Sequence, residues 1–456
     1  MACDDCNRTE LLRRAVAEAG RGLPAIEPGM PLPAGTGLSR RSFVTHAAGF
    51  ALAVYGGGRL SAALLDDGIA AAATGPQQPV LVSIFLEGGI DALSVLYPAS
   101  DPLYAQLRPK LALPASSGLP FAEDPRLLWH PSAAPLATLH GEGKLTVLPA
   151  VGYDHPDKSH FTSRHYWEVG ATDTHLLTGW LGRYLDATGA ADNPLQGLSL
   201  DNGLQPALAT ARVPVASLDS PDRYGFSDPR LTSFPLEQQM LDSAGGLGAV
   251  HAAGHDPALR QAGSAAQQAR ALRGRLSQFG ADFHPPVTYP QSTDDFPHRL
   301  AGLVAMLAAG LPLHCVALKA PGHYDTHADQ AKALSDGLKL TADSLLAFQR
   351  DLEARGLADR VIVHVWSEFG RRARENGSNG TDHGAAGVGF LLGSRVRGGM
   401  VGEFPGLAGG LDEQGNLRAT ADFRGVYAAL LEQWLGFDAA QVIPGAAQFQ
   451  RPQLLR

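Results

Sequence analysis

The chain has 456 residues, of which 45% are hydrophobic and 18% are charged, and its formal net charge is −8. This composition is globular, and the negative charge argues against non-specific nucleic-acid binding. The 53 glycines and 32 prolines predict many turns.

The first 75 residues differ in composition from the rest and are predicted to be a leader. The pair Arg40-Arg41 precedes a run of small apolar residues, and an A-x-A-like site follows at 71–73. This pattern is similar to a twin-arginine export signal, which implies the twin-arginine translocation machinery as a partner and a periplasmic, cell-surface or extracellular location. Because glycines and an arginine at 56–59 interrupt the apolar run, no stable membrane span is expected. The alternative is a flexible, alanine-rich leader.

Residues 76–456 are predicted to form one α/β domain in which strands and helices alternate. Continuous apolar runs predict buried strands at 80–86, 144–153, 311–319 and 361–366. Patterns of helix formers predict helices at 176–186, 256–280, 294–311, 328–354 and 422–436, and a short strand pair is expected within 388–407. The segment 154–170 is expected to be a polar loop. This order favours a mostly parallel central sheet flanked by helices on both faces.

Polar side chains follow each of the four predicted core strands. They are Asp91 after the first strand, Ser159 and His160 after the second, His323, Asp325 and His327 after the third, and Glu368, Asp382 and His383 after the fourth. The carboxyl ends of strands in an open α/β sheet converge on ligand sites, so these groups can meet in space. Carboxylates and imidazoles suit Zn²⁺, Mn²⁺ or Mg²⁺, and two such ions would support displacement at phosphorus or sulfur.

Five motifs point to one family. GGIDAL, SHF…YWEVG, HYDTHADQ, SEFGR and GTDHG, behind a leader with paired arginines, resemble the exported bacterial family of the domain of unknown function 1501. That family is related to the alkaline phosphatase and sulfatase superfamily, and the resemblance runs from about Pro79 to the C-terminus. It implies an alkaline-phosphatase-like central sheet with two divalent metal ions at its carboxyl edge.

The resemblance also implies roles for particular residues. Ser159 occupies the place of the nucleophile, although Thr162 and Ser163 are close by, and Arg371 would steady the anion. The superfamily's aspartate–histidine dipeptide is Glu368-Phe369 here, so one histidine ligand is missing. The metal ligands implied are Asp91, Asp325, His327, Glu368 and His383, and Asp382 could compensate for the missing histidine.

Two functions follow from these expectations. The first is an exported, metal-dependent hydrolase of phosphate or sulfate esters, acting on a small anionic ester or a polysaccharide-linked substrate. The second is a non-catalytic binding or assembly protein at the cell surface, which the missing histidine favours. Ordinary structural roles stay open as well, because Asp91 could cap a helix and Glu368 could pair with Arg371 or Arg372.

Overall fold

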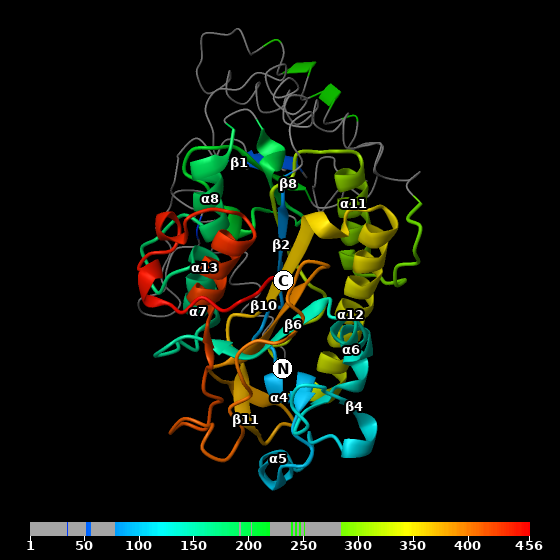
Figure 1. Ribbon diagram of the computed structural model, residues 1–456, viewed down its shortest axis with the longest axis vertical. Helices are drawn as coiled ribbons and strands as arrows, with labels where there is room; N and C mark the ends of the chain where they lie inside the picture. The colour runs from blue at the N-terminus through cyan, green and yellow to red at the C-terminus, as the bar shows by residue number, and fades with distance from the viewer. Residues whose placement is uncertain are drawn as a thin grey trace.

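The computed structural model describes residues 78–190, 193–201, 203–218 and 284–456, together with residue 34, residues 52–55 and six positions between 239 and 250. The predicted helix at 256–280 and nearly all of the predicted leader lie outside the described residues. In the described part, a central sheet stands between two layers of helices (Figure 1).

The central sheet has ten strands in the order β1-β8-β7-β9-β2-β10-β13-β6-β14, with β15 also paired to β6. Their bounds are β1 Leu52–Tyr55, β2 Val80–Phe85, β6 Leu145–Gly152, β7 Gly197–Ser199, β8 Val215–Leu218, β9 Cys315–Lys319, β10 Val361–Trp366, β13 Gly387–Leu392, β14 Gly399–Met400 and β15 Ala421–Asp422. Strands β8, β7, β9, β2 and β10 pair in parallel, whereas β1 is antiparallel to β8. The predicted mostly parallel sheet is therefore confirmed.

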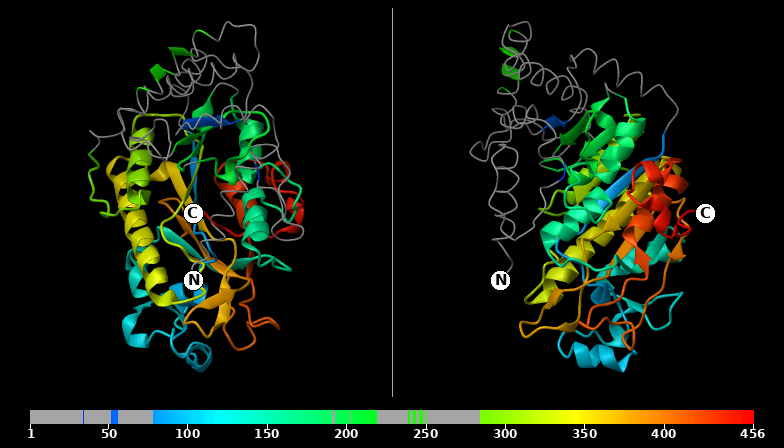
Figure 2. Two further views of the ribbon diagram at one scale, coloured as in Figure 1. Left: turned by 180° about the vertical axis from the view of Figure 1, so that it is seen from behind. Right: turned by 90° about the vertical axis from the view of Figure 1, so that its left-hand side faces the viewer.

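Helices cover both faces of this sheet (Figures 1 and 2). One layer holds α6 (Ala134–Gly141), α11 (Phe296–Ala308) and α12 (Gln330–Ala354), and the other holds α7 (His160–Val169), α8 (Trp180–Thr188) and α13 (Phe423–Gln433). Successive side chains of a strand point to opposite faces, so β2 contributes to both cores. Val82 and Ile84 pack in one hydrophobic cluster, while Leu81 and Phe85 pack in the other.

Smaller elements surround the sheet. Strands β3 (Leu96–Tyr97), β5 (Leu128–Trp129) and β4 (Leu119–Pro120) form a three-stranded sheet, and β11 (Arg371–Glu375) pairs with β12 (Thr381–His383). The short helices are α4 (Ala92–Val95), α5 (Pro102–Leu107), η1 (Ala115–Ser117), η2 (Pro131–Ala133), η3 (Pro194–Gln196), η4 (Pro206–Leu208), η6 (Ala358–Arg360), η7 (Ala439–Gln441) and η8 (Ala446–Gln448). Among the described helices, none is both long and apolar enough to cross a membrane.

Two expected elements differ from the structure. The predicted strand pair within 388–407 is wrong, because β13 and β14 do not pair with each other but lie on opposite sides of β6. The segment 154–170, expected to be a loop, contains α7. Ser159 caps the N-terminus of α7 and Gly170 ends it with a φ of 66°, and these two signals define a helix despite its polar composition.

The topology brings four strand ends to one edge of the sheet. Strand β13 is antiparallel to both β10 and β6, so β6 runs in the same direction as β10, β2 and β9. The segments that follow these four strands therefore lie at the same carboxyl edge, beside the β11–β12 hairpin. They carry Gly88, His160, Asp325 and Glu368.

Candidate metal centre

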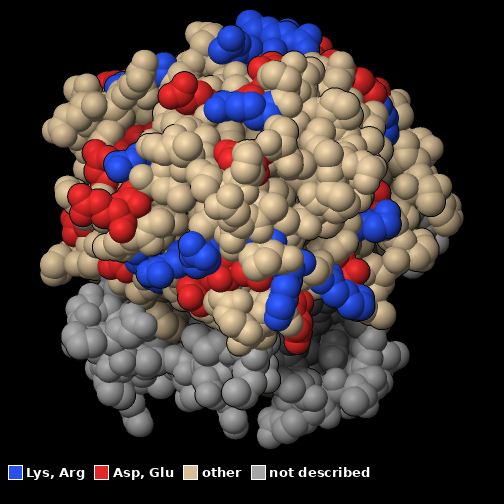
Figure 3. Space-filling view, turned by 90° about the horizontal axis from the view of Figure 1, so that it is seen from below, with Lys and Arg blue, Asp and Glu red and all other residues tan. Residues whose placement is uncertain are grey.

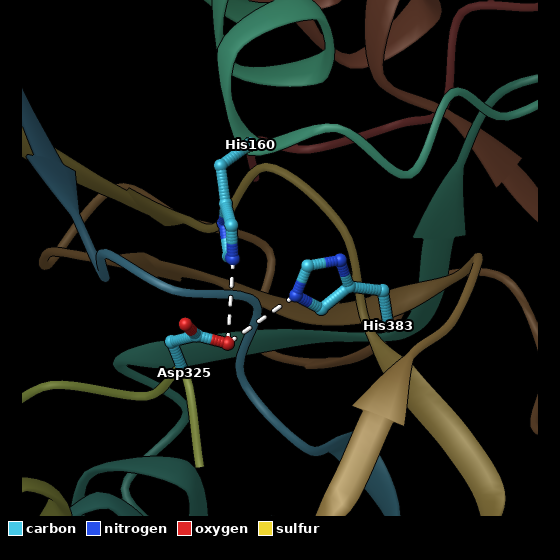
Figure 4. A group of neighbouring side chains, drawn as sticks. All are labelled: His160, Asp325 and His383. Atoms are coloured by element: carbon cyan, nitrogen blue, oxygen red, sulfur yellow. Dashed lines mark hydrogen bonds and ion pairs between the residues drawn. The ribbon is translucent and has the colours of Figure 1, made fainter. Parts of the chain in front are cut away.

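Three side chains from distant parts of the sequence converge at the carboxyl edge. His160 begins α7, Asp325 lies in the loop after β9, and His383 is the last residue of β12. Asp325 Oδ1 lies 3.3 Å from His160 Nε2 and 3.2 Å from His383 Nε2. Both imidazoles point their Nε2 atoms at this one oxygen (Figure 4). One ligand atom from each residue lies within 4.8 Å of the others, so the group could hold a metal ion.

A third imidazole, that of His327, lies beside this group. Its Nε2 atom is 3.0 Å from Asp325 Oδ1 and 3.0 Å from His383 Nε2. The side chain of His327 is 38% exposed, more than those of His160 (18%) and His383 (25%). His327 therefore lies toward the solvent side of the cluster. We call His160, Asp325, His327 and His383 the His/Asp cluster.

The other ring nitrogen of each histidine faces away from the cluster and meets an oxygen. His160 Nδ1 lies 2.8 Å from Glu368 Oε1, and His383 Nδ1 lies 2.8 Å from the backbone carbonyl of Lys158. His327 Nδ1 lies 3.2 Å from Asp382 Oδ1. Carboxylates and carbonyls only accept hydrogen bonds, so the Nδ1 atoms of His160 and His383 carry a hydrogen and donate. Such outer partners fix the tautomer of metal-binding histidines.

His383 Nδ1 donates to the carbonyl of Lys158, so the Nε2 atom of its neutral ring keeps a lone pair, which points at Asp325 Oδ1 and His327 Nε2. The Nε2 atoms of His327 and His383 lie 3.0 Å apart. His160 Nε2 is buried and lies 3.3 Å from Asp325 Oδ1. Imidazole nitrogens and a carboxylate oxygen that converge in this way are typical ligands of a metal ion. The donor set therefore fits a metal ion.

The spacing of the ligand atoms agrees with this. Zinc binds imidazole nitrogen and carboxylate oxygen at about 2.0–2.1 Å in tetrahedral sites, which separates neighbouring ligand atoms by roughly 3.3–3.4 Å. The 3.3 and 3.2 Å separations between Asp325 Oδ1 and the Nε2 atoms of His160 and His383 are close to that value. Small shifts of the side chains would suffice to bind the ion.

The pKa shifts within the His/Asp cluster show that it favours positive charge. Burial would raise the pKa of Asp325, but His160, His383 and Arg371 hold it well below its ordinary value. Burial would lower the pKa of His160, but Asp325 and Glu368 raise it to about 9. Burial lowers the pKa of His383, so this imidazole is neutral at pH 7. Without a metal, a proton on His160 balances the carboxylates.

Glu368 supports the cluster from outside it, which differs from the expectation that it binds metal directly. Its carboxylate is buried and accepts hydrogen bonds from Gly88 N at 2.9 Å, Gly89 N at 3.1 Å and Ser367 Oγ at 3.0 Å, besides its contact with His160. Burial would raise the pKa of Glu368, but its bond to His160 lowers it. Glu368 is thus the buried anion that orients His160.

Gly88 makes this approach of two loops possible. Its φ is 111°, in the region that favours glycine. A Cβ atom added to Gly88 would lie 2.3 Å from the backbone nitrogen of Asp325. The backbone of Gly88 therefore touches the Asp325 loop on one side and the carboxylate of Glu368 on the other.

Arg371 is not at the rim of the site, where an anionic ligand could reach it. Its guanidinium is buried and donates to the carbonyls of Gly88, Gly89 and Thr381 and, at 2.7 Å, to Asp325 Oδ1. Those four acceptors occupy all of its nitrogen atoms. Arg371 thus contacts Asp325 in this structure, and its expected role in steadying an anion stays a prediction.

Asp91 lies outside the His/Asp cluster and has other partners. Arg108 donates to both oxygens of its carboxylate, at 2.5 and 2.9 Å, and both side chains are fully buried. Ser94 Oγ and Gln330 Nε2 each donate at 2.6 Å to the same oxygen, Oδ2. This differs from the expectation that Asp91 binds metal, because its charge is already neutralised by Arg108.

Asp382 and the three candidate nucleophiles complete the predicted site. The side chain of Asp382 is half exposed and contacts His327, so it lies behind that imidazole. Ser159 Oγ accepts from the amides of Phe161 and Thr162 as the cap of α7. Ser163 Oγ is buried and donates to the carbonyl of Glu368, and Thr162 is buried as well. Ser159, which is partly exposed, is thus the most accessible of the three.

The structure therefore brings together some of the predicted residues and adds another. Asp325, His327 and His383 share the cluster, as expected from their positions after neighbouring strands. His160 is the added residue, because the resemblance implies no ligand role for it. The signal that could have found it is its place at the first position of a helix after a core strand, directly after the capping serine.

The fold and the site define an α/β protein with a candidate metal centre at the carboxyl edge of its sheet. Its family is shown by sequence. Residues 148–444 match the model of the family described as "Protein of unknown function (DUF1501)", and the chain belongs to that family. No curated protein was found to match the chain.

Solved structures with a similar fold are distant. A Bacteroides thetaiotaomicron protein from the metabolism of multiple glycosaminoglycans has 9% identity and a TM-score of 0.38, over 82% of this chain and 75% of that one. The phosphonate monoester hydrolase of Silicibacter pomeroyi has 12% identity and a TM-score of 0.32, over 82% and 76%. The soluble domain of lipooligosaccharide phosphoethanolamine transferase A from Neisseria meningitidis has 11% identity and a TM-score of 0.32, over 83% and 95%.

Proposed function

We propose that this protein is a metal-dependent hydrolase of phosphate or sulfate esters, with a single divalent ion held by His160, Asp325 and His383. His327, whose Nε2 atom lies 3.0 Å from both Asp325 Oδ1 and His383 Nε2, would be a fourth ligand. The observation that supports this most directly is the convergence of three Nε2 atoms on Asp325 Oδ1, with every Nδ1 engaged elsewhere. Three nitrogen donors and one oxygen donor favour zinc over Mg²⁺ or Mn²⁺.

When bound, the ion would act as a Lewis acid on an oxygen of the ester. The protein's own residues hold the centre rigid. Glu368 orients His160, Arg371 orients Asp325, and the carbonyl of Lys158 orients His383. Glu368 and Arg371 are buried, so His160 and Asp325 keep their geometry without reorganisation when substrate arrives.

Ser159 is the nucleophile in this proposal, because it precedes His160 and is more exposed than Thr162 or Ser163. Its Oγ would bond to phosphorus or sulfur as the ester alcohol leaves with a proton. Water would then hydrolyse the serine ester and restore the hydroxyl. The amides of Phe161 and Thr162, which now bind this Oγ, would favour negative charge near it.

The test measures metal content and activity in the same samples. Purified protein is reconstituted with Zn²⁺, its metal is counted by elemental analysis, and hydrolysis of p-nitrophenyl phosphate and p-nitrophenyl sulfate is followed. His383→Ala should lose both metal and activity, whereas Ser159→Ala should keep the metal and lose activity. The matched control is His175→Ala, since that imidazole is 94% exposed. A parent protein that binds no metal would exclude the proposal.

We infer the substrate class from the distribution of charged side chains at the surface. Lys and Arg side chains are intermixed with Asp and Glu on the face shown in Figure 3, and the described residues there form no broad positive area. Long-range attraction of a polyanion is therefore weak on this face. We propose a small anionic ester, or a single ester group on a polysaccharide, as the substrate.

Export by the twin-arginine route is also part of the proposal and rests on the leader sequence, in which Arg40-Arg41 precedes a small apolar run and an A-x-A-like site. Changing both residues to lysine should leave the protein inside the cell with its leader uncleaved. Cell fractionation followed by mass spectrometry of the N-terminus would measure this. Normal export of the double variant would contradict the assignment.

A second candidate function is a metal-stabilised binding protein without catalysis. It is favoured by the use of Ser159 as a helix cap and by the burial of Arg371 away from the rim. Under this alternative the parent protein binds metal but hydrolyses neither ester. Equilibrium binding of inorganic phosphate or sulfate to the metal-loaded protein would then measure its remaining function.

A further inference from the structure

A buried chain of hydrogen bonds connects Asp91, outside the His/Asp cluster, with the two segments that carry its ligands. The central residue is Gln330, the first residue of α12, which is 1% exposed. Its Nε2 donates to Asp91 Oδ2 at 2.6 Å. Its Oε1 accepts from Thr381 Oγ1 at 2.5 Å and from Thr326 Oγ1 at 2.9 Å.

The two threonines stand beside the candidate ligands. Thr326 lies between Asp325 and His327, and Thr381 lies two residues before His383. A backbone hydrogen bond of 3.0 Å from Thr381 N to the carbonyl of Thr326 joins the same two segments. The carboxamide of Gln330 thus links the loop after β9 to strand β12 from behind the cluster.

The charge of Asp91 fixes which way the carboxamide points. A carboxylate only accepts hydrogen bonds, so the NH₂ group of Gln330 must face Asp91 and its oxygen must face the threonines. Arg108 holds Asp91 in turn and also donates to the carbonyls of Arg372 and Ala373 on β11. The network therefore reaches both strands of the hairpin that ends in His383.

We propose that Gln330 is a positioning residue that sets the metal affinity of the His/Asp cluster from outside it, with Asp91 and Arg108 as its anchor. The bridge holds Asp325 and His383 at the separation a metal ion requires. This inference rests on the proposed metal centre.

The experiment removes one hydroxyl group while keeping the volume of the side chain nearly the same. Thr381→Val deletes the bond to Gln330, whereas Thr381→Ser keeps a hydroxyl and should restore it. Loss of an outer-shell partner typically lowers metal affinity about 10- to 100-fold. We expect the Zn²⁺ Kd of Thr381→Val, from chelator competition, to rise by at least about tenfold, and that of Thr381→Ser to stay near the parent value.

The matched control is Thr146→Val. Thr146 is as buried as Thr381 and also uses its hydroxyl in one buried hydrogen bond, with Gly398 N at 2.9 Å. It lies at the opposite end of β6 from the cluster, so this variant measures the effect of losing a buried hydroxyl alone. Its Zn²⁺ Kd should equal that of the parent.

Two further measurements keep the inference testable. The visible absorption of bound Co²⁺ reports ligand geometry and should shift in Thr381→Val but not in Thr146→Val. If Thr381→Val fails to fold, Thr326→Val removes the other hydrogen bond to Gln330 Oε1, and its Zn²⁺ Kd then tests the inference. Equal Zn²⁺ affinity and Co²⁺ spectra for the bridge variant and Thr146→Val would overturn the inference. A parent that binds neither ion would instead refute the proposed metal centre.

Discussion

Replacing Glu368 by glutamine should change the metal affinity of the cluster through His160. The carboxylate of Glu368 is surrounded by donors, namely the amides of Gly88 and Gly89, Ser367 Oγ and His160 Nδ1. A glutamine keeps one acceptor oxygen and places an NH₂ group where the other was. Whichever way it turns, that NH₂ group faces a neighbour that donated to the carboxylate.

The orientation that leaves the two glycine amides satisfied has a consequence for the metal. The NH₂ group of the introduced glutamine then donates to His160 Nδ1, so the hydrogen of that ring moves to Nε2. An Nε2 that carries a hydrogen cannot bind a metal ion. We expect the Zn²⁺ Kd to rise about 10- to 100-fold, which is roughly 1.4–2.7 kcal/mol. The opposite orientation leaves Gly89 N unpaired, which costs about 1–3 kcal/mol of stability.

The assay is a Zn²⁺ titration against a chelator, with urea unfolding of the metal-free protein alongside it. Glu432→Gln is the control, because Glu432 is partly exposed and pairs with Arg451 at the surface. Its Zn²⁺ affinity should not change, since such surface pairs contribute little. If Glu368→Gln binds Zn²⁺ as tightly as the parent, the reasoning about the tautomer of His160 is refuted.

Two more predictions concern stability. Arg371→Met removes a buried cation and leaves Asp325 without its partner, so the free energy of unfolding in urea should fall by about 3–5 kcal/mol. The control Arg350→Met, at the surface, should lower it by at most about 1 kcal/mol. A change in anion binding without a loss of stability would contradict the buried role of Arg371. Burial lowers the pKa of His364 to about 3, so the unfolded state binds a proton below about pH 6.5 that the folded state does not. The parent should lose about 2 kcal/mol more than His364→Asn between pH 7 and pH 5, and equal losses would contradict this.

Much of the fold could be predicted from the sequence because the sheet is buried on both faces. A strand covered on both sides needs a continuous apolar run, and the run at 361–366 has the same bounds as β10. The same signal failed for β13 and β14. A run of apolar residues shows that a strand is buried, but it does not show which neighbour the strand pairs with.

The sequence predicts which residues lie at the candidate site, but it does not predict which side chains they pair with. Asp325, His327 and His383 follow core strands, and the carboxyl edge gathers whatever follows such strands. Asp91 and Glu368 follow core strands too, but Asp91 pairs with Arg108 and Glu368 accepts hydrogen bonds from backbone amides. Nothing in the sequence near Arg108 shows that its guanidinium reaches Asp91, because that pairing depends on how α5 and the hairpin pack. Asp325 also meets a buried cation, Arg371, but it differs from Asp91 and Glu368 because three imidazoles surround its Oδ1 atom.

The ring of Phe369 lies against the imidazoles of the His/Asp cluster. Phe369 is buried, and its ring centroid lies 4.8 Å from those of both His160 and His383. A Cβ atom on Gly89 would come within 2.4 Å of the same ring, so the backbone packs tightly against it. An aromatic ring thus fills the space beside these two imidazoles. A phenyl ring offers no donor atom to a metal.

The stoichiometry should therefore be one ion per chain. With Asp91 paired to Arg108 and Glu368 satisfied by backbone amides, the carboxylates that would hold a second ion are already neutralised or hydrogen-bonded. Native mass spectrometry of the Zn²⁺-reconstituted protein measures this number directly. His383→Ala should bring it close to zero, and the exposed-histidine variant His175→Ala should leave it at one. Two tightly held ions in the parent protein would show that Asp91 or Glu368 exchanges its internal partner for metal, and the single-ion centre would then be wrong.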